Sequence, residues 1–213
     1  PRALNEYQKY CRQITRLKEQ YFANAQVWTG ETGSAQCGGQ PKLSDRFASC
    51  FWWADQLGAG ALNGQHVMIR QSLIGGDYGL IDRETLKPRP DYWLSWIWQQ
   101  LMGNQVFPVQ AKPSYLRAYC HSQPSGHGRT LMLVNLSSKP CDIRLNTAFG
   151  EVINTTHIIE SYSLTAKKLT SRKVRLNHKK LRFKGGQLPK LDEFRATATP
   201  QLEPYSITFW LIP

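Results

Sequence analysis

The 213-residue sequence lacks the features that identify several common protein classes. No hydrophobic run is long enough to span a membrane, and residues 1–20 lack the apolar core of a signal peptide. The five cysteines include no Cys-x-x-Cys pair and no grouping with histidine at metal-ligand spacing, so a structural metal is not expected. The glycine-rich residues 75–79 lack the Gly-Lys-Ser/Thr of a phosphate loop, which argues against a nucleotide site. We expect no metal and no cofactor.

An initiator methionine is also missing, since residue 1 is proline. We therefore expect a processed product or a fragment, with any targeting signal upstream. The odd cysteine count establishes no disulfide, although Cys120 and Cys141 could join two strands in an oxidising compartment. Two glycosylation sequons begin at Asn135 and Asn154, and they matter only if the chain is secreted.

The sequence does have a strong positive charge and enough apolar residues for a core. Its hydrophobic content is 41% with seven tryptophans, and its formal net charge is +12. The excess is local: no acid interrupts Lys167, Lys168, Arg172, Lys173, Arg175, Lys179, Lys180, Arg182 and Lys184. Such a run indicates either a solvated face or a surface for a polyanion, and because no nucleic-acid-binding motif is present, nucleic acid is not expected.

The first hundred residues alternate helices and strands, which is the order of a parallel α/β protein. Apolar spacing predicts helices at 3–22, 47–57 and 91–102, and strands at 25–28 and 66–69. Ser44 is expected to cap the second helix, and Gly58 and Gly60 to end it. Trp52, Trp53, Trp93 and Trp96 recur at helical spacing and are interpreted as core, whereas Trp98 falls off that face and is expected to contact the second domain.

After residue 106 the apolar residues alternate, and turn residues separate the runs, which favours an antiparallel β-sandwich. Strands are expected at 115–119, 131–136, 143–145, 173–176, 181–183 and 206–211. The domain boundary is expected near residues 103–112.

Several blocks of sequence occur in the same order as in one enzyme family: VWTGETGSA (27–35), SDRFASCFWWADQLG, RQSLIGGDYGLID, PRPDYWLSWIWQQLMG and YLRAY. The chain resembles heparanases and their plant-type relatives, the endo-β-glucuronidases of glycoside hydrolase family 79. The resemblance implies that residues 1–105 are the C-terminal part of a (β/α)8 barrel, with its strands 7 and 8 and flanking helices. Residues 106–213, ending in KVRLNHKKLRF and LEPYSITFWLIP, would then form the β-sandwich domain.

The resemblance also implies roles for single residues. Glu31 would be the catalytic nucleophile, and Gln71 a substrate-binding amide. Gly38 and Gly39 would donate backbone N–H groups to the carboxylate of a uronic acid, and Gly76 and Tyr78 would add a backbone and a hydroxyl contact. The residues agree with this, because catalytic groups of such barrels cluster at strand ends and only glycine lets the main chain approach so closely. Without the resemblance, Glu31 could be an ordinary strand-end acid, Gln71 would be a weak signal, and Tyr78 could simply pack under its loop.

The mechanism implied by the family is retaining hydrolysis, which needs a second carboxylic acid about 5–5.5 Å from the nucleophile. In the family, that acid/base is a glutamate preceded by asparagine at the end of the fourth barrel strand. The only Asn-Glu here is Asn5-Glu6, on the polar face of the first helix. We therefore expect half an active site, completed by the N-terminal part of the same protein, either in one longer chain or as a separate chain.

The full-length protein is expected to cut glucuronidic bonds in an acidic polysaccharide, most simply heparan sulfate. One alternative is an exo-β-glucuronidase acting on smaller glucuronides; another is a non-catalytic heparan-sulfate-binding relative, against which an intact Glu31 argues. The basic residues Lys173, Arg175, Lys179 and Lys180 are expected to help hold a sulfated glycan. By analogy with the family, the protein is expected to be secreted or lysosomal and to be a glycoprotein.

Overall fold

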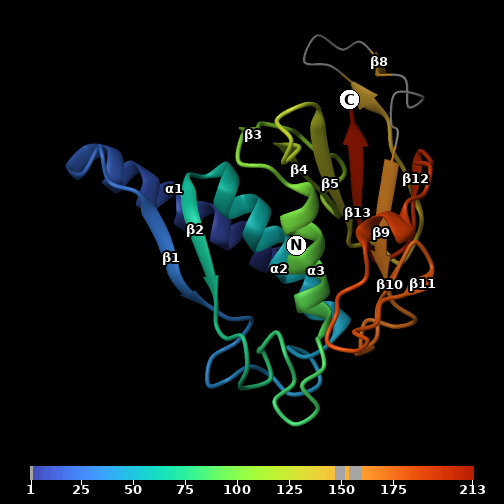
Figure 1. Cartoon of the computed structure of the whole chain (residues 1–213). Helices are drawn as coiled ribbons and strands as arrows, with labels where there is room; N and C mark the ends of the chain where they lie inside the picture. Colours follow the sequence, from blue (N-terminus) through green and yellow to red (C-terminus); the bar gives the residue numbers. More distant parts are fainter. Residues whose placement is uncertain (1, 147–151, 154–159) are drawn as a thin grey trace. The chain divides into compact units, whose positions relative to one another are not determined.

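The computed structural model describes residues 2–146, 152–153 and 160–213 (Figure 1). The sequon at Asn154 lies outside these residues. The chain divides into two compact units: Pro1–Trp93 with Lys168–Arg172, and Leu94–Lys167 with Lys173–Pro213. The division therefore falls inside helix α3, Pro90–Leu101. Among the described residues, no helix is both long and apolar enough to cross a membrane.

The first unit follows the expected order of helix, strand, helix and strand before α3. Its elements are α1 (Arg2–Tyr21), β1 (Val27–Thr32), α2 (Phe47–Leu62) and β2 (Gln65–Arg70). β1 and β2 pair in parallel, with Trp28 opposite Val67 (Figure 1). The prediction was wrong about the end of β1: Glu31 lies within the strand rather than after it. The backbone ladder reaches further than the apolar run, because the Gln71 N–H donates to the Thr32 carbonyl at 2.9 Å.

Helix α2 continues through the two glycines that were expected to end it. It runs to Leu62, and both Gly58 and Gly60 are buried. A Cβ on Gly60 would collide with the Met68 sulfur of β2. Gly60 therefore serves the close approach of α2 to the sheet, which explains why the helix does not stop there.

The start of α2 is capped by residues far along the chain. The prediction that Ser44 caps it was wrong. The Phe47 and Ala48 N–H groups donate to the carbonyls of Ser171 and Leu169, both at 2.9 Å. Ser44 instead accepts the Gln40 N–H at 2.8 Å within its own loop. These backbone acceptors satisfy the free N–H groups that a side-chain cap would otherwise take.

The second unit is built on a seven-stranded sheet in the order β11-β10-β9-β13-β5-β4-β3, and every pair in it is antiparallel. The strands of this sheet are β3 (Val106–Phe107), β4 (Leu116–Ser122), β5 (Arg129–Asn135), β9 (Glu160–Thr165), β10 (Arg175–Leu176), β11 (Lys179–Lys180) and β13 (Ser206–Ile212). Smaller pairs are formed by β6 (Cys141–Asp142) with β12 (Gln201–Leu202) and by β7 (Leu145–Asn146) with β8 (Val152–Ile153), and a 3-10 helix spans Leu191–Phe194. Of the predicted runs, 115–119, 131–136 and 206–211 correspond to β4, β5 and β13; the predicted strand at 181–183 is wrong, since that segment follows β11.

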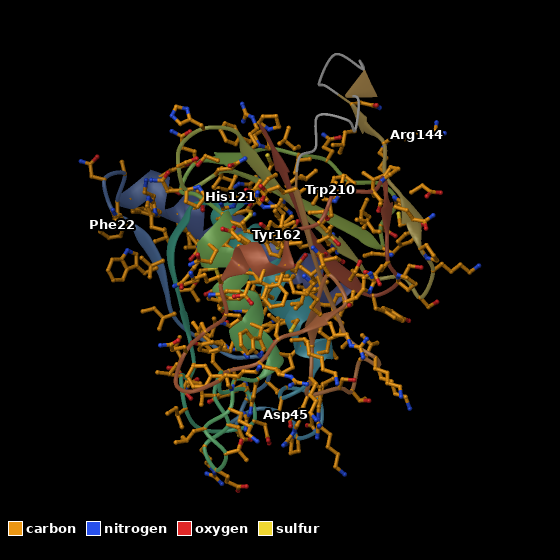
Figure 2. All side chains as sticks on the ribbon, turned by 45° about the vertical axis from the view of Figure 1, so that its right-hand side comes forward. Phe22, Asp45, His121, Arg144, Tyr162 and Trp210 are labelled. Carbon is orange, nitrogen blue, oxygen red and sulfur yellow. The ribbon has the colours of Figure 1, made fainter. Side chains whose placement is uncertain are left out.

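Both faces of the central strands are buried. Tyr162 of β9 lies opposite Phe209 of β13, so the two side chains share one face of the sheet. Trp210 follows Phe209 along β13 and therefore points to the opposite face; Tyr162 and Trp210 are labelled in Figure 2. Each of the three is at most 1% exposed. One hydrophobic cluster joins the sheet to the β6–β12 pair: Leu116, Leu131, Leu133, Cys141, Ile143, Leu202 and Trp210.

The tryptophans behave largely as their spacing predicts. Trp53, Trp93 and Trp96 are buried, whereas Trp52 is half-buried and stacks on Trp53 with ring centroids 5.8 Å apart. Trp98 meets the ring of His121 in β4 edge-on at 5.1 Å, which confirms its expected contact with the antiparallel part of the chain.

Among the described residues, the structure supports neither a Cys120–Cys141 disulfide nor a glycan on Asn135. Cys120 and Cys141 are free thiols. Asn135, the first sequon residue, is fully buried. Its amide donates to the carbonyls of Lys139 and Glu203, both at 2.9 Å, and its oxygen accepts the Ser137 N–H at 3.0 Å. A glycan on this amide nitrogen is incompatible with the fold.

Replacing Asn135 by alanine is expected to destabilise the fold by about 2 kcal/mol or more, because the fully buried Asn135 side chain loses its hydrogen bonds to three backbone groups at once. The decrease in the midpoint of urea denaturation measures it. Ser138→Ala, at an exposed neighbouring position, is the control and should leave the midpoint unchanged. Equal midpoints for the two variants would contradict the structural role of Asn135.

Candidate active site

The predicted nucleophile and the predicted substrate amide lie at the ends of neighbouring parallel strands. Thr32 is opposite Arg70 in the register, so Glu31 and Gln71 flank the same end of the two-stranded sheet. They share a pocket of about 570 Å³. Its lining residues are Glu31, Thr32, Gly33, Ala35, Gln36, Cys37, Gly38, Gln71 and Tyr78. Four of the six residues predicted to contact substrate thus line one pocket; Gly39 and Gly76 are not in its lining.

Glu31 is exposed, so a ligand can reach its carboxylate from solvent. It also borders a second pocket of about 620 Å³ that includes Tyr7 of α1 and Trp52 of α2. No other lining residue of the Glu31–Gln71 pocket carries a carboxylate. Within this part of the chain, the side chains that line the pocket therefore include one carboxylate, Glu31, together with two amides, one phenol, one hydroxyl and one thiol.

Two loops contribute most of the residues that line this pocket. The Gly38 loop (residues 33–46) follows β1, and the Tyr78 loop (residues 71–89) follows β2. The Gly38 carbonyl accepts the N–H groups of Asp77 at 2.6 Å and Tyr78 at 3.1 Å, which ties the loops together. A Cβ on Gly76 would collide with that carbonyl, so the contact requires glycine there.

The remaining predicted contacts have these positions. The Gly39 N–H donates to the Gln36 carbonyl at 3.2 Å, so it could bind a carboxylate only by exchanging that bond. The Tyr78 ring lies against Gly33, where an added Cβ would be 2.8 Å from the ring carbon Cδ1. Tyr78 therefore packs on the Gly38 loop while it also lines the pocket.

A buried arginine that the sequence reasoning did not single out lies directly before Gln71. The Arg70 side chain is 4% exposed; its Nη2 donates to Asp91 Oδ2 at 2.6 Å and to the Tyr78 carbonyl at 2.9 Å. Its guanidinium also lies 4.9 and 5.0 Å from the ring centroids of Trp52 and Trp53. Burial raises the pKa of Asp91 and lowers the pKa of Arg70, and each charge opposes the shift of the other.

A second buried arginine, also missed, lies under the Tyr78 loop. One nitrogen of Arg89, Nη1, donates to the carbonyls of Gly76 at 2.7 Å, Asp77 at 2.9 Å and Gly79 at 3.3 Å. Nη2 donates to Asp82 Oδ2 at 3.2 Å. The sequence offered little signal for the role of Arg89, because nothing distinguishes it from the other lysines and arginines of a strongly basic chain.

Glu6 does not contribute to the pocket. It forms an ion pair with Lys9 at 2.9 Å, and both side chains are about 60% exposed. This confirms the interpretation of Glu6 as a solvated helix residue. Across residues 2–146, 152–153 and 160–213, no group of three or more His, Cys, Asp or Glu side chains is placed to hold a metal ion.

Solved structures with the same fold are glycoside hydrolases. A 4-O-α-L-rhamnosyl-β-D-glucuronidase from Fusarium oxysporum superposes with a TM-score of 0.66, covering 89% of this chain and 44% of that one, at 16% identity. At such identity the likeness concerns the fold alone.

Sequence comparisons then identify the family. The model for "Glycosyl hydrolase family 79, N-terminal domain" matches residues 1–58. A hyaluronoglucuronidase from Hirudo nipponia is 33% identical over a match that covers 92% of this chain and 42% of the relative. Heparanase from Gallus gallus is 31% identical over a match that covers 100% of this chain and 42% of the relative. Baicalin-β-D-glucuronidase from Scutellaria baicalensis is 32% identical over a match that covers 89% of this chain and 36% of the relative. The chain belongs to glycoside hydrolase family 79, and it spans less than half the length of these relatives.

Proposed function

We propose that this chain supplies the nucleophile and the uronate-binding loops of a retaining β-glucuronidase. The observation that carries the proposal is that Glu31, Gln71 and Tyr78 line one pocket, with the first two at the ends of adjacent parallel strands. In this mechanism Glu31 attacks the anomeric carbon, and the glycosyl-enzyme is then hydrolysed with net retention.

The acid/base is proposed to come from outside this sequence. It would protonate the leaving oxygen and then activate water from about 5–5.5 Å away, the spacing of retaining enzymes. Trp28 on β1 is 58% exposed and Ile69 on β2 is 45% exposed. Parallel strands are normally covered on both faces, so we propose that further barrel strands from the N-terminal part of the protein, in the same chain or in a separate one, cover these residues. The antiparallel sheet with its β6–β12 layer would then be the sandwich domain.

The substrate class follows from the two loops. Gly38 and the Tyr78 loop bring main-chain groups and a phenol to the pocket, which suits the carboxylate of a glucuronic acid. We propose endo-cleavage of heparan sulfate by a secreted or lysosomal protein. Exo-cleavage of smaller glucuronides is the second candidate, because one relative of this chain is named as a glucuronidase of baicalin.

The antiparallel unit adds a basic surface, the β10–β11 hairpin. Arg175 and Lys180 lie directly opposite each other in its register and are exposed, as is Lys173. Like charges directly opposite are unfavourable, and a bound anion relieves the repulsion. Lys179 also donates to the Glu193 carbonyl at 2.6 Å. We propose that this hairpin binds the sulfate groups of the glycan.

Neutralising Lys179 and Lys180 to glutamine is expected to weaken heparin binding and to flatten its dependence on ionic strength, because exposed charges act over a Debye length of about 10 Å at 0.1 M salt. Elution from heparin at several salt concentrations measures it. The control removes two other exposed charges of this unit, Lys139 and Arg144, the latter labelled in Figure 2. Equal losses for both pairs would point to net charge alone, and salt-insensitive binding would exclude the proposed surface.

The reaction is tested by incubating the complete protein with an aryl β-glucuronide and with heparan sulfate, and following the products by proton NMR and gel filtration. A β-anomer formed first supports retention. Internal fragments of heparan sulfate support endo action, whereas monosaccharide release alone favours the second candidate. Heparin binding without hydrolysis of either substrate would reject the enzyme proposal.

A further inference from the structure

The Tyr78 loop is held by two buried arginines rather than by regular secondary structure. Its successive carbonyls at residues 76–79 all accept from guanidinium groups: three from Arg89 and one, that of Tyr78, from Arg70. Arg89 is 8% exposed. A buried guanidinium needs acceptors for its N–H groups, and its planar shape fixes the directions in which those acceptors lie.

The same peptide groups are held on their opposite side by the Gly38 loop. The peptide joining Gly76 to Asp77 directs its oxygen at Arg89 and its N–H at the Gly38 carbonyl. The peptide joining Asp77 to Tyr78 does the same. Since the C=O and N–H of a trans peptide point in opposite directions, both peptides bridge Arg89 to Gly38. Their orientation depends on the arginine as much as on the glycine.

The charge of each arginine is met by its own carboxylate. Arg70 pairs with Asp91 at 2.6 Å, and Arg89 pairs with Asp82 at 3.2 Å. The Thr85 backbone N–H, its hydroxyl and Arg89 hold the pKa of Asp82 well below its usual range, so Asp82 stays ionised. Little net charge remains, and the directional hydrogen bonds are the main contribution of each arginine to the loop.

We propose that Arg89 and Arg70 are positioning residues for uronate specificity: they fix the Tyr78 loop so that Tyr78 and the neighbouring main chain fit the carboxylate of the sugar. The inference rests on the proposed β-glucuronidase function. Arg89 does not line the Glu31–Gln71 pocket, so it acts through the loop and not by touching substrate.

The test uses the complete protein and two mechanism-based traps, cyclophellitols of glucuronic-acid and of glucose configuration, with the rate of adduct formation on Glu31 as readout. The wild-type protein is expected to prefer the glucuronic-acid trap. Arg89→Gln should reduce that preference about ten- to 100-fold, the scale of a misplaced contact group. Arg89→Lys keeps the charge and one donor nitrogen but loses the planar guanidinium, so its preference should fall between those of the wild type and Arg89→Gln. The control is Arg83→Gln, at an exposed position of the same loop, and should match wild type.

The outcomes distinguish a failure of the positioning role from a failure of the proposed β-glucuronidase function. An unchanged preference in Arg89→Gln would overturn the positioning role, whether the two trapping rates stay at their wild-type values or fall by the same factor. If Arg89→Gln does not fold, the same comparison on Arg89→Lys decides, and an unchanged preference there overturns the role as well. Wild-type protein that reacts with neither trap rejects the proposed function itself, and this inference with it.

Discussion

Replacing Glu31 by glutamine is expected to reduce hydrolysis of β-glucuronides by about 10⁴-fold or more, the scale seen when a catalytic nucleophile is removed. The amide has the shape of the carboxylate but cannot attack the anomeric carbon. Because Glu31 is exposed and lies on a strand, the fold should not change. The turnover rate of the complete protein on an aryl β-glucuronide measures the loss, and the denaturation midpoint checks the fold.

Glu6→Gln is the matched control for this result. It makes the same chemical change at an exposed carboxylate on α1, which forms an ion pair with Lys9. Its turnover should equal that of the wild type. Comparable turnover in the Glu31 and Glu6 variants would remove Glu31 from the mechanism.

Replacing Asp91 by asparagine is expected to give the largest loss of stability, about 3–5 kcal/mol, as when one partner of a buried ion pair is removed. Asp91 is 3% exposed and accepts from Arg70 at 2.6 Å and from Ser49 at 2.8 Å. Without the carboxylate, the Arg70 charge remains buried beside two indole rings. The loss is measured as the shift of the urea midpoint at constant slope.

The control for Asp91 is the exposed ion pair on α1. Lys9→Gln should change the stability by no more than about 1 kcal/mol, because solvent screens such a pair. A shift of similar size for the two variants would mean that the Arg70–Asp91 pair contributes no more than a surface contact. The Asp91 variant should also weaken glucuronide binding, since Arg70 holds the Tyr78 carbonyl.

The proximity of Glu31 and Gln71 could be predicted from sequence because it follows from local rules. Glu31 is the last residue but one of β1, Gln71 directly follows β2, the two are one βα unit apart, and parallel pairing brings strand ends to the same edge. The positions of the long central strands β4, β5 and β13 were predictable for a similar reason, since side-chain alternation marks them directly, although the predicted limits of β4 and β5 differ from the observed ones by up to three residues.

What the sequence could not show depends on contacts between distant segments. The cap of α2 comes from Ser171 and Leu169, more than a hundred residues away, and no local pattern encodes it. β9 was missed because it offers only two large apolar residues, Tyr162 and Leu164, although both are buried in the sheet. The role of Arg89 emerges only once the loop carbonyls are seen to converge on its guanidinium.

The most direct measurement of the central claim is to treat the complete protein with a glucuronic-acid cyclophellitol trap and map the adduct by peptide mass spectrometry. We expect one glucuronyl adduct, on the peptide that contains Glu31, which would establish the nucleophile, the retaining mechanism and the uronate preference together. An adduct on another carboxylate would contradict the assignment of Glu31. No adduct, with heparin binding intact, would contradict the enzyme function and leave a glycan-binding protein.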